Sequence, residues 1–372
     1  MKKATVLRLT LPRGRRVLAV SDVHGDLPLL CRLLEKARFS PDDLLFVLGD
    51  LLEKGNESLA TLRYLMALSK THTVYMVNGN CDDLVTGFVD GREELPDEFF
   101  RYYIGVFGRR CTLVQMGLEA GLTEAEMEDY PRFRAILRER FVPEFHFLRG
   151  FYTIIDTPRL LFVHGGVPSD RDMEGLDAWR CMKNDAFALQ DASLSKWCVV
   201  GHTPATLYRP HIPCSNPLIQ PEKRLISMDG GCSIKADGQL NLLVLPDGYS
   251  TEFEFLSADN LPAVTALDPQ APTSDSVNIR WGHNVLDVVA PGEEFTRCYH
   301  GESGQTVDIL TDYLYPGKDG QTLCRDSTNY GLEVSPGDTL SVVRRTSRGL
   351  LAKMNGVTGW YWGRIAAESH TP

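Results

Sequence analysis

Polar residues that bind cations recur in this sequence, each shortly after an apolar run. They are Asp22, His24, Asp50, Asn80, His164 and His202. Carboxylate, imidazole and amide oxygen atoms together suit Mn, Fe or Zn better than Ca²⁺, and no thiolate cluster indicates a structural zinc site. Two divalent ions fit this set better than one, with Asp50 as the bridge. Two ions about 3.5–4 Å apart are suited to the hydrolysis of phosphate esters.

Short strands are expected to bring these residues together. The apolar runs and the polar residues that end them are VLAV (17–20), LLFVLGD (44–50), TVYMVNGN (73–80), RLLFVHGG (159–166), KWCVVGHT (196–203) and RLISMDGG (224–231). Helical spacing between the first three runs indicates an alternation of strand, loop and helix, and such loops converge at the carboxyl edge of an α/β sheet. Each polar residue alone is typical of a helix cap or a turn, but their ordered recurrence favours a metal site.

The composition predicts a soluble globular protein with two domains. The chain has 372 residues, of which 43% are hydrophobic and 24% are charged, and a domain is usually about 100–200 residues. Its 39 Lys and Arg against 49 Asp and Glu give a net charge of −10, which excludes nucleic acid as a bulk partner. No apolar stretch approaches the roughly 20 residues of a membrane span, so no membrane partner is expected.

The N-terminal segment and the cysteines indicate a cytoplasmic protein. Arg8, Arg13, Arg15 and Arg16 interrupt any apolar core of a signal peptide. The nine cysteines are scattered and never form a C-x-x-C pair, as expected of reduced thiols.

The pattern along the chain changes twice. We expect a first domain at 1–258 with a helical insertion at about 91–147, where Glu, Arg, Phe and Tyr are abundant. A polar stretch with three prolines at 259–276 predicts a linker. Short β-type runs separated by PG, DG and SPGD turns at 277–372 predict a small all-β barrel.

Six motifs together resemble the calcineurin-like metallophosphoesterases, over roughly residues 15–255. They are DVHG (22–25), GDLLEKG (49–55), GNCD (79–82), VHGG (163–166), VGHTP (200–204) and ISMDGGC (226–232). The resemblance implies an α/β fold, a four-layer αββα sandwich with the dimetal site at one edge of the sheets, and it places the segment 228–233 beside that site. The nearer branch is that of the phosphoprotein phosphatases, which includes bacterial serine/threonine phosphatases and dinucleoside tetraphosphate hydrolases. GNCD also resembles a phosphodiesterase branch, but Pro204 stands where that branch usually has a ligating His.

Two motifs depart from the phosphatase branch. Where that branch usually reads GDxVDRG, this chain has Glu53 in place of the second Asp and Lys54 in place of the Arg. Where the branch usually reads GNHE, this chain has Cys81 in place of the His that protonates the leaving group. The resemblance makes Asp50, Cys81 and Glu53 the expected catalytic residues. Lys54 and Asn80 are expected to contact the substrate phosphate, with Arg180 as a second clamp. Lysine lacks the bidentate fork of arginine, and a thiol matches general-acid catalysis near pH 7 less well than an imidazole.

The C-terminal GVTGWYWGRI resembles the end of bacterial SH3-like domains, over roughly residues 277–366. Trp360, Tyr361 and Trp362 either form a groove for a peptide or cell-wall ligand or fill the core of the barrel.

These observations predict a dimetal phosphoesterase that cleaves phosphomonoesters by attack of metal-bound hydroxide, with Mn²⁺ as the first expectation and Fe or Zn as alternatives. Its partner would be a phosphorylated protein or small phosphoester. The alternatives are hydrolysis of a dinucleoside polyphosphate or a phosphodiester, and a metal-binding scaffold that has lost turnover.

Overall fold

The computed structural model describes residues 2–366, which fall into two compact units. Unit 1 runs to Pro204 and resumes over Pro217–Asp259, whereas unit 2 contains Ala205–Asn216 and continues from Asn260. The chain therefore enters the second unit earlier than the predicted boundary at 258. Among the described residues, none of the helices has both the length and the apolar character that crossing a bilayer requires.

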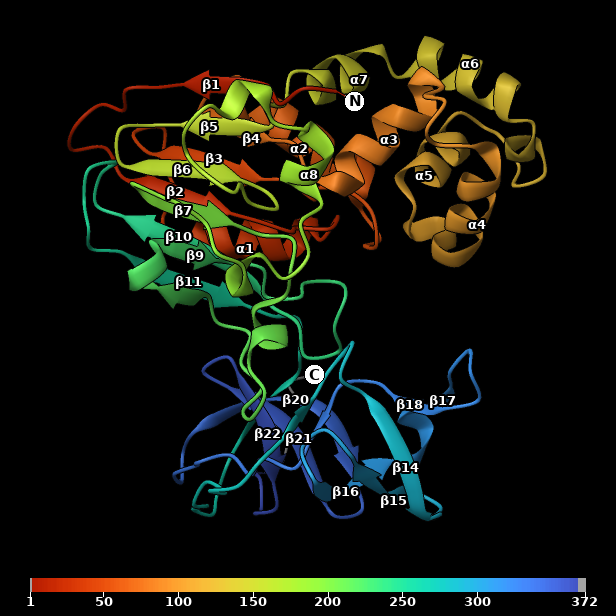
Figure 1. The fold of residues 1–372 in the computed structure, drawn as a ribbon, viewed down its shortest axis with the longest axis vertical. Coiled ribbons are helices and arrows are strands. Elements are labelled where there is room, and N and C mark those ends of the chain that lie inside the picture. Colours follow the sequence, from red (N-terminus) through yellow and green to blue (C-terminus); the bar gives the residue numbers. More distant parts are fainter. Residues whose placement is uncertain (1, 367–372) are drawn as a thin grey trace. The chain divides into compact units, whose positions relative to one another are not determined.

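Unit 1 contains two mixed β-sheets (Figure 1). The five-stranded sheet has the order β11 (Glu254–Ala258), β10 (Leu240–Leu245), β2 (Val17–Val20), β3 (Leu44–Leu48) and β4 (Thr73–Val77). The six-stranded sheet has the order β1 (Val6–Arg8), β5 (Ile154–Asp156), β6 (Leu160–Val163), β7 (Trp197–Val200), β9 (Leu225–Ser227) and β8 (Leu218–Gln220). Strands β2, β3 and β4 are parallel to one another, and so are β6, β7 and β9, so the loops of each set leave the same edge of their sheet.

A hydrophobic core joins the two sheets. Phe46 of β3 and Phe162 of β6 stack with ring centroids 4.1 Å apart. All five residues of β3 are buried, as its unbroken apolar run predicts for a strand covered on both faces.

Helices cover the other face of the five-stranded sheet. They are α1 (Leu27–Lys36) and α2 (Ser58–Leu68), and Leu30 and Leu33 of α1 share a core with Leu18 and Val20 of β2. Asp26 caps α1, because its carboxylate accepts from the backbone N–H of Leu29 at 3.1 Å. Between β6 and β11 the described chain supplies a single α-helix, α8 (Ala178–Met182). The mixed α/β class is thus confirmed. The stretch from β6 to β11 supplies only this short helix towards the second helical layer of the predicted αββα sandwich.

The predicted helical insertion follows α3 (Asn80–Asp90). It consists of α4 (Asp97–Phe107), α5 (Thr112–Glu119), α6 (Tyr130–Arg140) and α7 (Val142–Arg149). Figure 1 shows these helices gathered at one end of the sheets of unit 1, the end at which β4 leads into α3.

Unit 2 is rich in strands, but its described residues form no closed barrel. The sheets are a four-stranded one, β12 (Ala263–Thr265), β20 (Thr339–Thr346), β21 (Gly349–Met354) and β22 (Val357–Tyr361), a two-stranded one, β13 (Asn278–Ile279) and β19 (Ser327–Thr328), and a five-stranded one, β16 (Gln305–Leu310), β15 (Phe295–His300), β14 (Val285–Ala290), β18 (Thr322–Cys324) and β17 (Leu314–Pro316). Strand β12 lies in the stretch 259–276 that was predicted as a linker. It pairs with β20 and is therefore part of the four-stranded sheet.

Candidate metal centre

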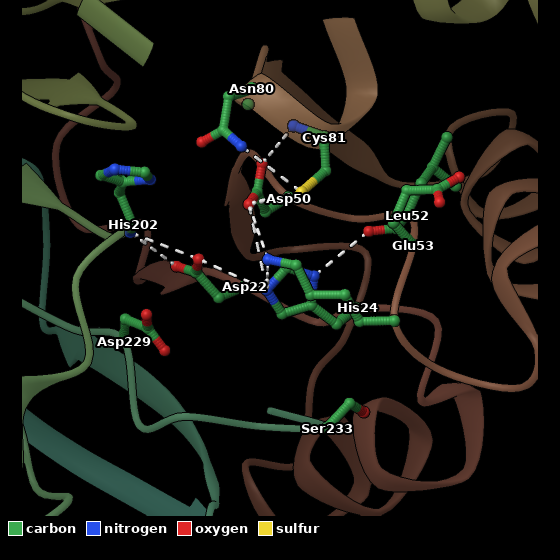
Figure 2. A network of polar contacts seen from close by, with 12 residues as sticks. Asp22, His24, Asp50, Leu52, Glu53, Asn80, Cys81, His202, Asp229 and Ser233 are labelled. Atoms are coloured by element: carbon green, nitrogen blue, oxygen red, sulfur yellow. Dashed lines mark hydrogen bonds and ion pairs between the residues drawn. The ribbon is translucent and has the colours of Figure 1, made fainter. Parts of the chain in front are cut away.

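The predicted ligands lie where the parallel strands of unit 1 end. Asp22 and His24 follow β2, Asp50 follows β3, and Asn80 follows β4; from the other sheet, His164 follows β6 and His202 follows β7. Figure 2 shows Asp50 between Asn80 and Cys81 on one side and His24 on the other.

Asp50 belongs to two groups of metal-binding side chains. In one group the ligand atoms of Asp50, His164 and His202 all lie within 4.8 Å of one another, and in the other so do those of Asp50, His24 and Cys81. The Nε2 atom of His164 is 3.3 Å from Asp50 Oδ1, and the Nε2 atom of His24 is 3.9 Å from Asp50 Oδ2. The shared carboxylate has the position that the sequence predicted for a bridge between two cations.

Backbone carbonyls orient two of the histidines. His24 Nδ1 is 3.2 Å from the carbonyl oxygen of Leu52, and His164 Nδ1 is 2.7 Å from that of Leu48. A carbonyl oxygen only accepts, so Nδ1 carries a proton in both rings, and Nε2 is the ring atom that faces Asp50.

Asp22 joins the two sheets at the site. Its carboxylate accepts from the backbone N–H of His202 at 3.1 Å and from the Ser21 hydroxyl. It also lies 3.9 Å from His24 Nε2. The carboxylate therefore faces ligands from both sheets (Figure 2).

Unsatisfied buried atoms test whether this site suits a cation. Among the described residues, Asn80 Oδ1 and His164 Nε2 are buried and make no hydrogen bond. Both are atoms that the sequence assigned to metal binding, and a buried polar atom without a partner is costly unless an ion or water completes it. The donor set and its two open atoms fit divalent cations.

Burial and the neighbouring charges both shift the pKa values of the proposed ligands, and at His164 they act in opposite senses. Burial raises the pKa of Asp22 to about 6 and lowers that of His24 to about 3 and that of His202 to about 4. Burial alone would lower the pKa of His164, but the carboxylates of Asp50 and Asp22 raise it to about 9. Protonation is thus favoured at His164 and disfavoured at His24 and His202, whose neutral rings are the form that binds a cation.

Cys81 is directed at the shared carboxylate. Its thiol donates to Asp50 Oδ2 at 3.0 Å, and its backbone N–H donates to Asp50 Oδ1 at 2.8 Å. Burial and the charge of Asp50 raise the pKa of this thiol well above its usual value. Asn80, at the start of α3, donates its side-chain amide to the same sulfur at 3.4 Å.

Glu53 turns towards the insertion. Its carboxylate accepts from the backbone N–H of Thr112, the first residue of α5, at 2.8 Å. Burial raises the pKa of Glu53. This hydrogen bond holds the start of a helix, whereas the resemblance implied a catalytic role for Glu53.

Two lysines contact the ligands. Lys54 Nζ is 3.4 Å from His24 Nε2 and 3.8 Å from Asp50 Oδ2. Lys183 Nζ is 3.3 Å from His202 Nε2 and pairs with Asp185, whose carboxylate also contacts His202 Nε2 at 2.8 Å. Arg180, the predicted second clamp, is exposed on α8, and it is Lys183, just past that helix, that contacts a ligand.

Three acidic residues lie at this site for which the sequence analysis predicted no role as ligands, although it placed segment 228–233, which contains Asp229, beside the site. Asp229 follows β9, is buried, and leaves its Oδ2 without a hydrogen bond in the described structure. The sequence held a signal for Asp229, because the run RLISMDGG repeats the pattern of a strand followed by an acid and glycines. Asp82 lies in the GNCD motif and Asp185 in none of the six motifs, and the contacts of both depend on loops that meet only in the folded chain.

The comparison with protein families decides the relationship. Residues 15–223 match the family described as calcineurin-like phosphoesterases. The chain belongs to this family. The match covers five of the six motifs and confirms the resemblance to this family, and it confirms the prediction of an enzyme that hydrolyses phosphoric esters.

Similar curated proteins share a short segment with this phosphoesterase. The symmetrical bis(5'-nucleosyl)-tetraphosphatase of Mannheimia succiniciproducens is 41% identical over 70 residues, which cover 18% of this chain and 25% of that protein. The protein of the same name from Pseudomonas putida is 48% identical over 66 residues, 17% of this chain and 22% of that protein. The chain thus matches about a quarter of the length of these relatives.

Similar solved structures cover more of the chain. A putative diadenosine tetraphosphatase has 19% identity and a TM-score of 0.42, over 69% of this chain and 99% of that one. A serine/threonine phosphatase from Saccharomyces cerevisiae has 11% identity and a TM-score of 0.43, over 70% of this chain and 85% of that one. At these TM-scores the likenesses carry no argument about activity.

Proposed function

We propose that this protein is a dimetal-dependent hydrolase of phosphoric esters. The observation that carries the proposal is the position of Asp50 between two groups of ligand atoms, each within 4.8 Å. Asp22, His24, Asp50, Asn80, His164 and His202 would hold the cations. Bound there, two divalent ions supply Lewis acidity and an activated water.

The lysines at the two ends of the site bind the substrate phosphate. Lys54 stands beside His24 and Lys183 beside His202, so the two ammonium groups flank the shared carboxylate. An ammonium group binds a phosphate oxygen as a point charge, without the paired hydrogen bonds of an arginine. This arrangement selects for phosphate charge rather than for one fixed orientation of the ester.

The environment of Cys81 selects the leaving group. Its S–H donates to Asp50, so it points at a ligand and not towards a departing oxygen. A substrate whose leaving group is stable as an anion needs little proton transfer. We therefore propose phosphomonoesters with good leaving groups, such as aryl phosphates, as the first substrate class.

The second candidate substrate is the phosphoanhydride of a dinucleoside polyphosphate. It is supported by the orientation of the Cys81 thiol, which donates to Asp50 and not to a leaving group, and by the names of the similar tetraphosphatases. The order of substrate preference is tested by comparing the hydrolysis of four substrates by the same metal-loaded chain. They are an aryl phosphate, a phosphoserine peptide, a dinucleoside tetraphosphate and a bis-aryl phosphodiester. Preference for the tetraphosphate or the diester would overturn the first substrate class, and two bound metals without turnover on any substrate would favour a scaffold.

Metal identity and location are also proposals. The oxygen and imidazole donors support Mn²⁺, with Fe and Zn as alternatives. The nine cysteines of the chain are free thiols, which supports a reducing, cytoplasmic location.

For unit 2 we propose a peptide or cell-wall ligand, although the SH3-like barrel is not found. The proposal is supported by a surface groove of about 410 Å³ lined by Phe295, Arg297, Arg348, Trp360 and Trp362, among others. Trp362 is 51% exposed, whereas Tyr361 is fully buried in the core of the four-stranded sheet.

A further inference from the structure

The thiol of Cys81 lies inside the candidate metal centre. Cys81 is the second residue of α3, and its side chain is 2% exposed. Figure 2 shows its sulfur directed at the carboxylate of Asp50, which His24 also faces. Two hydrogen bonds to Asp50, one from the sulfur and one from the backbone nitrogen, hold the Cys81 side chain in this orientation.

The distances among these donors match those around one cation. Metal bonds of about 2.0–2.3 Å place two ligands of a tetrahedral ion roughly 3.3–3.8 Å apart. Asp50 Oδ2 is 3.0 Å from Cys81 Sγ and 3.9 Å from His24 Nε2, and the three ligand atoms of this group lie within 4.8 Å of one another. The two distances that involve Asp50 Oδ2 differ from this spacing by only a few tenths of an ångström.

Positive charge already collects at this corner of the site. Lys54 Nζ lies within 4 Å of both His24 Nε2 and Asp50 Oδ2, and its side chain is 23% exposed. A long flexible side chain with access to solvent is able to turn aside when a divalent ion takes its place.

We propose that Cys81 is a ligand of one of the two cations, together with His24 and Asp50. The inference rests on the proposed dimetal function and adds a sulfur donor to its ligand set. The thiol proton leaves to solvent when the sulfur binds the ion. A thiolate is a soft ligand, so this position favours Zn²⁺, Fe²⁺ or Co²⁺ over Mn²⁺.

Cobalt loading of the full chain tests the proposal without an activity assay. We expect the wild-type protein with two Co²⁺ per chain to show a near-ultraviolet sulfur-to-cobalt charge-transfer band. Cys81→Ser should lose that band, whereas Cys31→Ser, which changes a partly exposed thiol of α1, should keep it.

The outcomes separate this inference from the proposed function. Two bound Co²⁺ without the band in the wild type, or a band that persists in Cys81→Ser, would overturn the sulfur ligand and leave the dimetal site standing. A wild-type chain that binds no cobalt would overturn the dimetal site itself. If Cys81→Ser fails to fold, zinc-edge X-ray absorption of the wild type decides, because a sulfur ligand appears at about 2.3 Å.

Discussion

Several proposed ligands of the candidate metal centre are held in a strained backbone conformation. Asp22, His24, Asp50 and His202 have φ values of 54°, 48°, 47° and 68°, in the left-handed region. Such a conformation costs about 1–3 kcal/mol for a residue other than glycine, so it persists only where the surroundings enforce it. Hydrogen bonds from Cys81 to Asp50 and from His202 to Asp22 are part of that enforcement. The ligands are therefore positioned before a cation binds.

The two lysines should contribute to substrate binding, and Arg180 should not. We expect Lys54→Ala and Lys183→Ala each to raise KM about tenfold, the size of one lost charged hydrogen bond. Arg180→Ala, a matched loss of one positive charge close by in sequence, should leave KM unchanged. Steady-state kinetics on an aryl phosphate measures all three. A larger effect for Arg180→Ala than for Lys183→Ala would restore the clamp that the sequence suggested.

The place of the proposed ligands in the fold was predictable from sequence, because each lies shortly after a strand. The direction of Glu53 was not, since it depends on Thr112, which is distant in sequence and comes close only when the insertion folds. Lys183 was missed for a local reason. Helix α8 has only five residues and ends at Met182, so the next side chain leaves the helix and reaches His202.

At the scale of elements, two loops are tied together beside the metal centre. The Asp82 carboxylate accepts from the backbone N–H groups of Leu52 and Gly79, both at 3.1 Å. This connects the loop after β3 to the start of α3. Each loop carries ligands, so the packing of one loop fixes the position of the other.

Close packing of these loops makes Gly79 essential. A Cβ atom at this position would overlap the backbone nitrogen and the Oδ1 atom of Asp50. We expect Gly79→Ala to lower the metal content of the purified chain well below that of the wild type. Gly105→Ala, in α4, meets no atom within 4 Å and serves as the control. Equal metal content in the two variants, measured by elemental analysis, would show that Asp50 tolerates displacement.

Glu53 should affect stability in a pH-dependent way. Burial raises its pKa above the usual 4.5, so folding favours the protonated carboxyl, and that contribution is lost as pH rises through the folded pKa. Glu53→Gln keeps an acceptor for Thr112 without charge. We expect it to be no more stable than the wild type at acid pH and at least as stable at neutral pH.

Glu53→Ala removes the acceptor and is the comparison for this prediction. It should cost about 1–3 kcal/mol at every pH, and about 2–4 °C of melting temperature for each kcal/mol. Thermal melts across the pH range measure both variants. A Gln variant that melts below the wild type only at neutral pH would mean that the charged carboxylate stabilises the fold.

At the scale of the whole molecule, the order of the chain differs from a simple series of domains. Residues 205–216 belong to unit 2, although 217–259 return to unit 1. The first segment of unit 1 thus ends at Pro204, the last residue of the GHTP motif and two residues after His202. Local sequence patterns did not reveal this crossing, because it depends on pairings such as that of Cys214 with Val357.

The buried Asn278 holds the crossing segment within unit 2. Its side-chain amide donates to the carbonyl oxygens of Thr206 at 3.0 Å and Arg209 at 2.8 Å. We expect Asn278→Ala to lower the free energy of unfolding by about 1–3 kcal/mol while the metal content stays that of the wild type. Calorimetry together with elemental analysis checks both parts, and a loss of bound metal would show that unit 2 supports the metal centre.

The proposed dimetal site depends most on Asp50, whose carboxylate both groups of ligand atoms share. The most direct test is the metal content of the wild type and of Asp50→Asn, measured together with hydrolysis of an aryl phosphate. Asp42→Asn, an exposed carboxylate before β3, is the matched control. We predict about two metals per chain and turnover for the wild type and the control, and loss of both for Asp50→Asn. Full metal content and activity in Asp50→Asn would contradict the shared ligand and the function built on it.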